Sequence, residues 1–380
     1  MLSILLLDLD EVLIQQVAYH QSLQECVERV GRWCGFESAR LTHEDIALFE
    51  SMGVTSEWDS SAICAALLLD RAWSVDPECR LPESPDAPDG PLHNLPVPDF
   101  QSFFQTALER GVSGIEARRL TEQRLLEGKQ HTPAQRCALQ TMLHDAYDTD
   151  RSLTNRIIQE LNLGAEEFEA CYGRTAALLG EGLLRTRDLP LISAREAAQL
   201  VHWSTDSGKR AVVFTNRLSR LPDGTGGAPE AEIGLARLGL SSLPFISMGH
   251  LGWVCAQRGL EPQSLLKPSP VHALAALRMA AGDTLDNALI AAAALELDHQ
   301  DIGGWHRLDP AHVIVFEDSF RGLQSACGAQ QSLNRIGVRV DLDLRGVSTR
   351  DVKRRALEVA GGVVYSDFTS AARDVLAGTG

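Results

Sequence analysis

The stretch LLLDLDEVLI, at residues 5–14, decides the fold of this chain. It begins with an apolar run that has no polar face, which is typical of a strand buried on both sides in a parallel α/β sheet. The run leads into Asp8 and Asp10, and because side chains alternate along a strand these two carboxylates point the same way. Open α/β sheets bind ligands at the carboxyl ends of their strands. The stretch therefore predicts a site, although a strand that ends in a polar turn accounts for the same pattern.

The composition excludes several classes of protein. The length of 380 residues allows two domains, and a hydrophobic share of 44% is ordinary for a soluble globular protein. A formal net charge of −16 repels nucleic acid and anionic membranes, so we expect neither as a partner. An anionic substrate then needs positive charge that the site itself supplies.

The cysteines and the apolar runs indicate a compartment. The eight cysteines are scattered without a Cys-x-x-Cys pair, and the sequence starts without a basic region followed by a long apolar stretch. No run approaches the roughly 18–20 apolar residues that cross a bilayer. We therefore expect a cytoplasmic protein with reduced thiols.

A long helical block follows the first strand. Residues 15–189 contain almost no strand-like alternation, whereas helical spacing is clear from residue 19 to residue 34. The pattern predicts further helices at 42–52, 58–73, 98–109, 115–126, 133–146, 152–161 and 166–172. Residues 76–98 are rich in Pro, Asp and Gly, and we expect a solvated, poorly ordered loop there. The prediction is an all-helical domain at 15–189, inserted into an α/β core made of residues 1–14 and 190–380.

The remainder of the chain alternates between the two element types. Strands are predicted at 210–216, 244–248, 311–316 and 362–365, and helices at 194–207, 231–238, 270–281, 285–296, 319–327 and 349–360, with the segment 334–340 lying between the last two helices. Such alternation implies parallel strands joined by right-handed crossovers. The predicted fold class is α/β, a three-layer Rossmann-like core with an inserted helical domain. The glycines near 222–227 indicate a surface loop rather than a phosphate cradle.

Three later stretches place polar side chains where the first pair of acids lies. VVFTNR at 212–217 ends a strand in Thr215, whose hydroxyl suits a phosphate oxygen or a helix cap. LLKPSP at 265–270 puts Lys267 just before a helix that starts with proline, where it is either a phosphate ligand or a solvated charge. VIVFEDSFRG at 313–322 ends a strand in Glu317 and Asp318, a pair of acids that suits Mg²⁺. The alternative is a helix N-cap made by Asp318 or Ser319.

Taken together and in this order, four motifs resemble those of the haloacid dehalogenase-like (HAD) hydrolase superfamily. They are DLDEVL at 8–13, FTN at 214–216, KP at 267–268 and FEDSFRG at 316–322. The form of the last motif is similar to the phosphoglycolate-phosphatase and β-phosphoglucomutase-like branch. One class of this superfamily carries a helical cap directly after the first motif, where this chain has its helical block.

The resemblance implies roles for the acids. Asp8 would be the nucleophile that forms an aspartyl-phosphate, and Asp10 would protonate the leaving oxygen and then activate water. Asp8, the backbone carbonyl of Asp10 and Asp318 would hold Mg²⁺, with Glu317 as a further candidate ligand.

The resemblance also implies a phosphate-binding set, made of Thr215, Asn216 and Lys267. Lys267 and Mg²⁺ would then provide the local positive charge that the acidic chain otherwise lacks. Two features depart from the family pattern. Glu11 stands where many relatives have glycine, and the interval from Lys267 to Glu317 is long, so that residues 280–309 are expected to form an inserted helix and loop that serves association.

The expected activity is Mg²⁺-dependent hydrolysis of a small phosphorylated metabolite. A phosphomutase, which returns the phosphoryl group to its substrate, uses the same first step, and a catalytically idle binding module is possible on the same fold. Dehalogenation does not need the second acid and is disfavoured by Asp10. Substrate choice would come from the helical domain, where Glu57, Trp58 and Arg174 are candidates that packing explains equally well.

Overall fold

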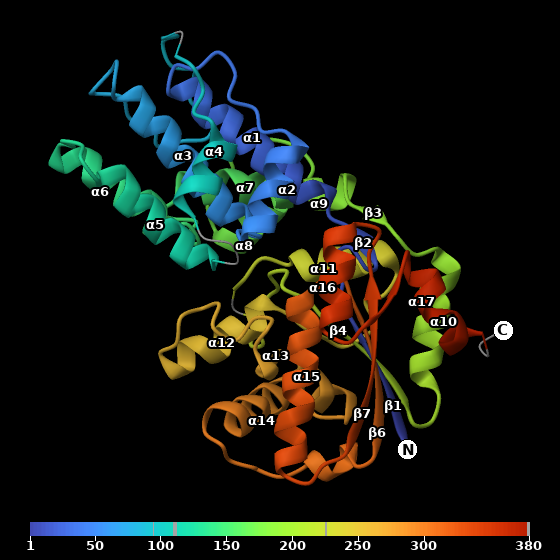
Figure 1. Cartoon of the computed structure of the whole chain (residues 1–380). Helices are drawn as coiled ribbons and strands as arrows, with labels where there is room; N and C mark the ends of the chain where they lie inside the picture. The colour runs from blue at the N-terminus through green and yellow to red at the C-terminus, as the bar shows by residue number, and fades with distance from the viewer. Residues whose placement is uncertain (94, 109–111, 225, 378–380) are drawn as a thin grey trace. The chain divides into compact units, whose positions relative to one another are not determined.

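The computed structural model describes residues 1–93, 95–108, 112–224 and 226–377. The chain divides into two compact units (Figure 1). The first, called here the α/β unit, combines Met1–Gln16 with Asp188–Gly380, and the second, the helical unit, is Val17–Arg187. The helical unit is therefore an insertion that follows the first strand of the α/β unit.

The α/β unit is built on a six-stranded parallel sheet with the order β5-β4-β1-β6-β7-β8. Its strands are β1 (Leu2–Leu7), β4 (Lys209–Phe214), β5 (Phe245–Ile246), β6 (Ala311–Glu317), β7 (Val340–Val347) and β8 (Val363–Tyr365). The chain runs outward from β1 through β4 to β5 and then returns to the other side of β1. The carboxyl end of β1 thus lies at the switch point of the sheet, where such folds bind their ligands. The predicted α/β class with a parallel sheet is confirmed.

Both faces of the sheet are covered by helices, which gives three layers. Along β1, Ile4 and Leu6 belong to one buried cluster and Leu5 and Leu7 to the other, as a period of two requires. The first face is covered by α12 (Met248–Arg258), α13 (Pro270–Ala280), α15 (Phe320–Arg335) and α16 (Asp351–Val359), with α14 (Leu285–Leu297) packed on the far side of α13. The second face is covered by α10 (Ala194–Thr205), α11 (Glu230–Leu238) and α17 (Phe368–Leu376). β1 is therefore buried on both sides.

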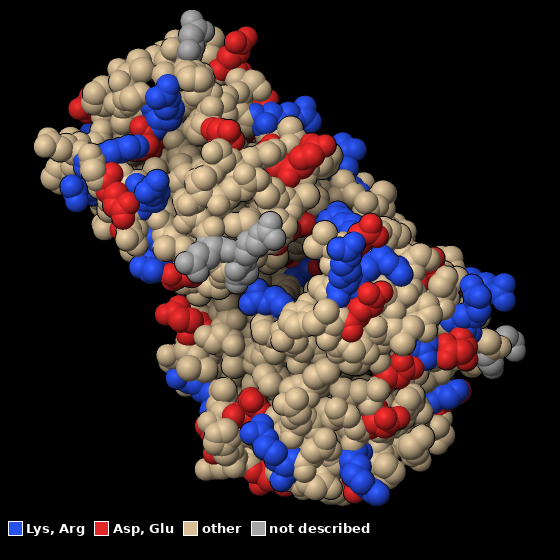
Figure 2. Space-filling model, viewed as in Figure 1, with Lys and Arg blue, Asp and Glu red and all other residues tan. Residues whose placement is uncertain are grey.

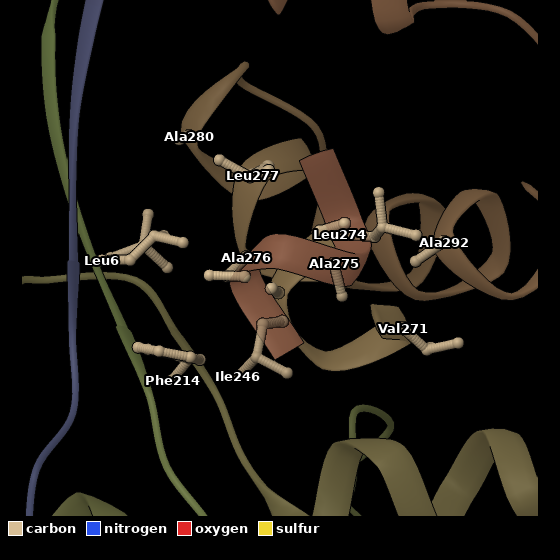
Figure 3. Packing of buried hydrophobic residues seen from close by; sticks show 14 of the residues in the cluster. Leu6, Phe214, Ile246, Val271, Leu274, Ala275, Ala276, Leu277, Ala280 and Ala292 are labelled. Atoms are coloured by element: carbon tan, nitrogen blue, oxygen red, sulfur yellow. The ribbon is translucent and has the colours of Figure 1, made fainter. Parts of the chain in front are cut away.

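Small side chains bring α13 close to the sheet and to α14. Figure 3 shows Leu6 of β1 and Phe214 of β4 pointing toward Ala276 and Leu277 of α13. On the far side of α13, alanines such as Ala292 of α14 fill the contact. Alanine needs little room, so the helices pack tightly, and the position of the α13 N-terminus, close to Lys267, is fixed.

Two helices of the α/β unit were not predicted. The expected strand at 244–248 is only Phe245–Ile246, because Met248 already begins α12. Gly249 weakens the helical pattern, yet it is required there, since a Cβ at this position would lie 2.4 Å from the backbone oxygen of Ser219. The second missed helix, α17, begins at an Asp367 cap whose carboxylate accepts from the backbone N–H of Ser370.

Two predicted boundaries were wrong by more than two residues. The helix expected at 319–327 continues to Arg335. Gly328 does not end it: a Cβ added there would lie 2.7 Å from Cγ of Pro270, so glycine serves close packing at this position. The strand that follows is Val340–Val347, so the segment 334–340 holds the end of α15 and a turn, and contributes only its last residue to β7.

The helical unit is an assembly of amphipathic helices around α3, whose apolar residues are buried along most of its length. Its helices are α1 (Val17–Trp33), α2 (His43–Met52), α3 (Glu57–Ala72), α4 (Phe100–Ala107), α5 (Gly114–Leu126), α6 (Pro133–His144), α7 (Leu153–Leu163), α8 (Ala165–Tyr172) and α9 (Leu183–Thr186). Thr42 and Thr132 close capping boxes at the starts of α2 and α6. The helix predicted at 98–109 is α4, and residue 109 itself lies outside the described residues.

The proline-rich segment contacts the rest of the helical unit over its described part, which excludes residue 94. Its residues are mostly exposed or half-buried, and hydrogen bonds tie the segment to the end of α1. The backbone N–H of His93 donates to the oxygen of Gly35 at 2.9 Å, and Nε1 of Trp33 donates to the oxygen of Ala87 at 3.1 Å. These bonds hold a sequence whose composition alone indicates disorder.

A short antiparallel pair lies where the chain leaves and re-enters the α/β unit. β2 (Ile14–Gln15) pairs with β3 (Leu189–Pro190), with Ile14 opposite Pro190 and Gln15 opposite Leu189. Two-residue strands are too short to be read from a sequence pattern, so this pair was not predicted. None of the helices in the described part of the chain has both the length and the apolar character needed to span a membrane. Figure 2 shows acidic and basic side chains interspersed on the viewed face of each unit.

The packing of α12 gives a test with an internal control. Gly249→Ala should lower the free energy of unfolding by about 1–3 kcal/mol, because the added methyl group overlaps a backbone oxygen. Gly252→Ala, in the same helix but with nothing within 4 Å of the new Cβ, should raise it by about 0.5–1 kcal/mol through helix propensity. Urea unfolding followed by circular dichroism measures both, and equal effects of the two substitutions would contradict this packing.

Candidate active site

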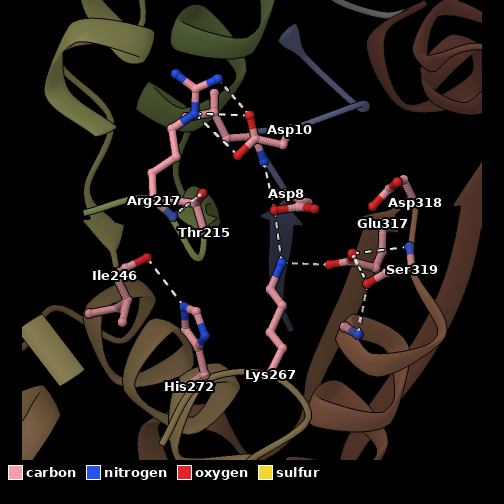
Figure 4. A network of polar contacts seen from close by, with 12 residues as sticks. Asp8, Asp10, Thr215, Arg217, Ile246, Lys267, His272, Glu317, Asp318 and Ser319 are labelled. Carbon is pink, nitrogen blue, oxygen red and sulfur yellow. Dashed lines mark hydrogen bonds and ion pairs between the residues drawn. The ribbon is translucent and has the colours of Figure 1, made fainter. Parts of the chain in front are cut away.

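Polar side chains from four parts of the sequence meet at the carboxyl edge of the sheet (Figure 4). Asp8 directly follows β1, Thr215 follows β4, and Glu317 ends β6 with Asp318 next to it. Leu7 of β1 is paired with Val213 on one side and Phe316 on the other, so these strand ends lie level with one another. Lys267 arrives from the loop that precedes α13. The structure thus brings together the predicted residues of the four motifs.

Lys267 joins the two central strands through their acids. Its Nζ lies 2.8 Å from Oδ1 of Asp8 and 2.7 Å from Oε2 of Glu317. The side chain of Lys267 is only 5% exposed, and its Nζ lies 3.9 Å from the centre of the Phe214 ring. The alternative that Lys267 is a solvated surface charge is therefore wrong.

Charge balance keeps Lys267 a cation. Burial alone would lower the pKa of the Lys267 ammonium, but the negative charges of Asp8 and Glu317 outweigh it and raise that pKa. The neighbouring His272 behaves in the opposite way, because burial and the charge of Lys267 both lower its pKa well below the usual range. Of these two groups, Lys267 therefore carries a positive charge and His272 is neutral at pH 7.

Asp8 belongs to a cluster of three buried acids. Carboxylate oxygens of Asp8, Glu317 and Asp318 lie within 4.8 Å of one another. Burial raises the pKa of Asp8 above its ordinary value, and the charge of Glu317 raises it further, which Lys267 offsets only in part. Burial likewise raises the pKa of Asp318 to about 6, although an ion pair with Lys353 acts in the opposite direction. Oxygen donors with uncompensated negative charge fit a hard divalent cation such as Mg²⁺.

Glu317 is held in place by the start of α15. Its Oε1 accepts from the backbone N–H of Ser319 at 3.2 Å and from the Ser319 hydroxyl at 2.7 Å. The same hydroxyl accepts from the backbone N–H of Gly322, so Ser319 is the N-cap of α15. A Cβ on Gly322 would lie 2.0 Å from Oε2 of Glu317, so glycine is needed to leave room for the carboxylate. The helix-cap alternative is thus correct for Ser319, and it supports the acid cluster.

Asp10 is oriented by a partner that sequence analysis did not identify. Arg217 makes a two-pronged ion pair with it, in which Nη2 lies 2.6 Å from Oδ1. Arg217 was visible as the residue after the Thr-Asn pair, and a basic residue so close to a strand end is the signal that could have found it. Lys353 lies 35 residues after its partner Asp318, and nothing in its local pattern separates it from its basic neighbours.

Of the remaining predicted residues, Thr215 and Glu11 have structural partners. Thr215 is fully buried, and its hydroxyl oxygen accepts from the backbone N–H of Arg217 at 3.1 Å. Asn216 is exposed. Glu11 adopts a φ of 58°, a conformation that favours glycine, and its carboxylate accepts from the backbone N–H of Gln16. Glu11 therefore stabilises the turn after β1.

Two of the specificity candidates also have partners within the helical unit. Trp58 is buried and its ring lies 5.1 Å from that of Tyr147. Arg174 pairs with Asp150 at 2.6 Å. These contacts account for both residues by packing and local charge.

Comparisons with known proteins give information about the fold and none about the chemistry. No family model matches the chain, and no curated protein matches it. A solved structure described as target ZR25 of the Northeast Structural Genomics Consortium is 18% identical over all of both chains, with a TM-score of 0.55. The phosphatase Tt82 from Thermococcus thioreducens is 13% identical over 94% of this chain and 99% of its own, with a TM-score of 0.48. At this identity the first likeness shows a shared fold alone, and the second is too distant to argue from.

The charge of the acid cluster predicts how stability depends on pH. Because the pKa of Asp318 is raised in the folded chain, the folded state binds a proton more readily than the unfolded one, so metal-free stability is lost as pH rises from about 4 through about 6. Replacing Asp318 with Asn removes this loss. The free energy of unfolding of Asp318→Asn relative to wild type should therefore increase by on the order of 2 kcal/mol between pH 4 and pH 7.5 in EDTA.

Unfolding in EDTA and in Mg²⁺ checks this expectation. Mg²⁺ should stabilise the wild type at pH 7.5 and much less at pH 4.5, where protons compete for the same oxygens. Asp298→Asn serves as the control, because this acid pairs with Arg258 at the surface and its pKa is lowered, so its pH dependence has the opposite sign. A wild type that Mg²⁺ stabilises equally at both pH values would contradict the assignment.

Proposed function

We propose that this chain is a Mg²⁺-dependent phosphatase of the HAD superfamily, in its phosphoglycolate-phosphatase and β-phosphoglucomutase-like branch, and that it hydrolyses a small phosphorylated metabolite. The observation that carries the proposal is the placement of Asp8. It lies at the switch point of the sheet, 2.8 Å from the ammonium of Lys267 and next to the carboxylates of Glu317 and Asp318. The four sequence motifs that resemble the superfamily supply these residues.

Asp8 is suited to be the nucleophile. Its carboxylate is nearly buried, and the contact with Lys267 fixes one of its oxygens. In the proposed first step the other oxygen attacks phosphorus, the bond between phosphorus and the ester oxygen breaks, and Asp10 gives the leaving oxygen a proton. The product is an aspartyl-phosphate on Asp8.

Hydrolysis of this intermediate regenerates the chain. Asp10, now a carboxylate, takes a proton from water as the water oxygen attacks phosphorus. The bond from phosphorus to Asp8 breaks, and inorganic phosphate leaves. The partial exposure of the Asp10 side chain, 21%, is consistent with contact between this acid and both substrate and water.

The negative charges of phosphate and nucleophile must be offset. Lys267 supplies one positive charge, and Thr215 and Asn216 would donate hydrogen bonds to the phosphate. Asp8, Asp318 and the backbone carbonyl of Asp10, with Glu317 as a further ligand, would hold the metal. A bound Mg²⁺ would supply charge neutralisation between the nucleophile and the phosphoryl oxygens.

Phosphate release from a panel of phosphorylated metabolites tests the proposal. The wild type should release phosphate in Mg²⁺ and not in EDTA, and Asp8→Asn should lower kcat at least about 10³-fold, because no covalent intermediate can form on the amide. Asp206→Asn is the matched control, since it changes an exposed acid that pairs with Lys209, and it should leave kcat unchanged.

The outcomes separate the alternatives. Exchange of the phosphoryl group between positions of a substrate, without release, would identify a phosphomutase instead. Turnover of no ester under any condition would contradict the enzymatic proposal and favour a binding module. Activity that survives both EDTA and Asp8→Asn would exclude this site as the source.

A further inference from the structure

Asp10 is held by a network that extends beyond the proposed nucleophile and metal ligands. Nε and Nη2 of Arg217 donate to Oδ1 of Asp10 at 2.9 and 2.6 Å, and Nε also lies 3.1 Å from Oδ2. Figure 4 shows the guanidinium fork of Arg217 facing this carboxylate. Two-pronged pairing fixes both the position and the rotation of a carboxylate, which contact with a single ammonium does not.

A second acid holds Arg217 itself. Nη2 of Arg217 lies 2.8 Å from Oδ2 of Asp188, and the two side chains are 1% and 0% exposed. The backbone oxygen of Asp188 accepts from Nε of Arg237 at 2.6 Å. Asp188 is the first residue of the α/β unit after the helical unit, and the next two residues form β3. The network therefore begins where the chain re-enters the α/β unit and ends on Asp10.

We propose that Arg217 is a positioning residue for the acid–base chemistry of Asp10, and that Asp188 anchors Arg217 for this purpose. This inference rests on the proposed phosphatase activity. The guanidinium cannot be deprotonated in a protein, so it orients Asp10 without exchanging a proton itself. Oδ1 of Asp10 accepts two short bonds from Arg217, whereas Oδ2 accepts one longer bond. Oδ2 is thus the oxygen that exchanges the proton with the leaving group and then with water.

If Arg217 positions Asp10, the effect of replacing Arg217 on the rate of each step should depend on the leaving group of the ester. An alkoxide needs the proton of Asp10 in order to leave, whereas a nitrophenolate is stable without one. Both kinds of ester give the same aspartyl-phosphate on Asp8, and its hydrolysis again requires Asp10 as a base. A misplaced Asp10 therefore slows both steps for an alkyl ester but only the second step for a nitrophenyl ester.

Rapid-mixing kinetics of Arg217→Met with para-nitrophenyl phosphate and with glycerol phosphate test the proposal. For glycerol phosphate, kcat should fall about 100-fold or more, with KM changing far less. For para-nitrophenyl phosphate, a burst of nitrophenolate equal to the concentration of active sites should precede a slow steady state. Arg217→Lys keeps the charge but loses the fork, and should recover part of kcat. Asp188→Asn should give a smaller loss with the same dependence on the leaving group.

A buried arginine elsewhere in the α/β unit provides the structural control. Arg278 of α13 pairs with Asp283 and donates to the backbone oxygen of Gly303 at 2.6 Å. Arg278→Met should lower the unfolding temperature and reduce turnover of both esters by the same factor, without a burst.

Other outcomes would contradict either the positioning role of Arg217 or the proposed function. If the wild type hydrolyses both esters and Arg217→Met leaves both rates unchanged, or lowers both by the same factor without a burst of nitrophenolate, the positioning role is wrong while the phosphatase proposal stands. If the wild type hydrolyses neither ester, nor any in the metabolite panel, the proposed function fails and this inference fails with it.

Discussion

Buried negative charge at the centre of the sheet is the constraint on which the rest of this structure depends. Asp8, Glu317 and Asp318 bring three carboxylates within 4.8 Å of one another, at a place where water cannot stabilise them. Moving such charges out of water costs several kcal/mol each unless they are paired. Lys267 pairs with two of the acids and Lys353 with the third. The three acids therefore outnumber their two lysine partners, and a divalent cation would supply the missing positive charge.

The fold holds these charges together through its packing. β1 lies between β4 and β6, so that the acids of β1 and β6 leave the sheet side by side. Gly322 and Ser319 of the α15 start leave room for Glu317 and bond it. The alanine-rich contact between α13 and α14 sets the position of the loop that carries Lys267. Concentrating like charges in this way lowers the free energy of unfolding of the chain, a cost that functional sites generally carry.

The local pattern of the sequence was enough to predict much of this site. Asp8, Thr215 and Glu317 end or follow apolar runs, and because parallel strands end at one edge, their convergence follows from the strands alone. The partners of the site residues were harder to foresee. Arg217 meets Asp10 across 207 positions of sequence, so only its place next to a strand end hints at the pairing. Lys353 stands beside Arg354 and Arg355 in α16, and nothing in that local pattern marks it as the partner of Asp318.

The errors in the fold prediction have a similar origin. Gly249 and Gly328 weaken the helical pattern of the sequence, but each lies within a helix. Glycine is needed at these positions because the Ser219 backbone and the Pro270 ring, respectively, leave no room for a side chain. The proline-rich segment after α3 reads as disordered, yet residues such as Trp33 and Gly35 at the end of α1 bond its backbone. In these cases tertiary contacts outweighed local propensity, which a single sequence does not display.

The central claim is that the ends of β1 and β6 share one divalent cation beside Asp8, the proposed nucleophile. A crystal structure of the wild type grown in Mg²⁺ tests it most directly. We predict an ion with octahedral oxygen ligands that include carboxylate oxygens of Asp8 and Asp318, at about 2.0–2.1 Å, with the ammonium of Lys353 displaced from Asp318. An ion bound elsewhere, or Asp8 and Asp318 too far apart to share one, would contradict the account.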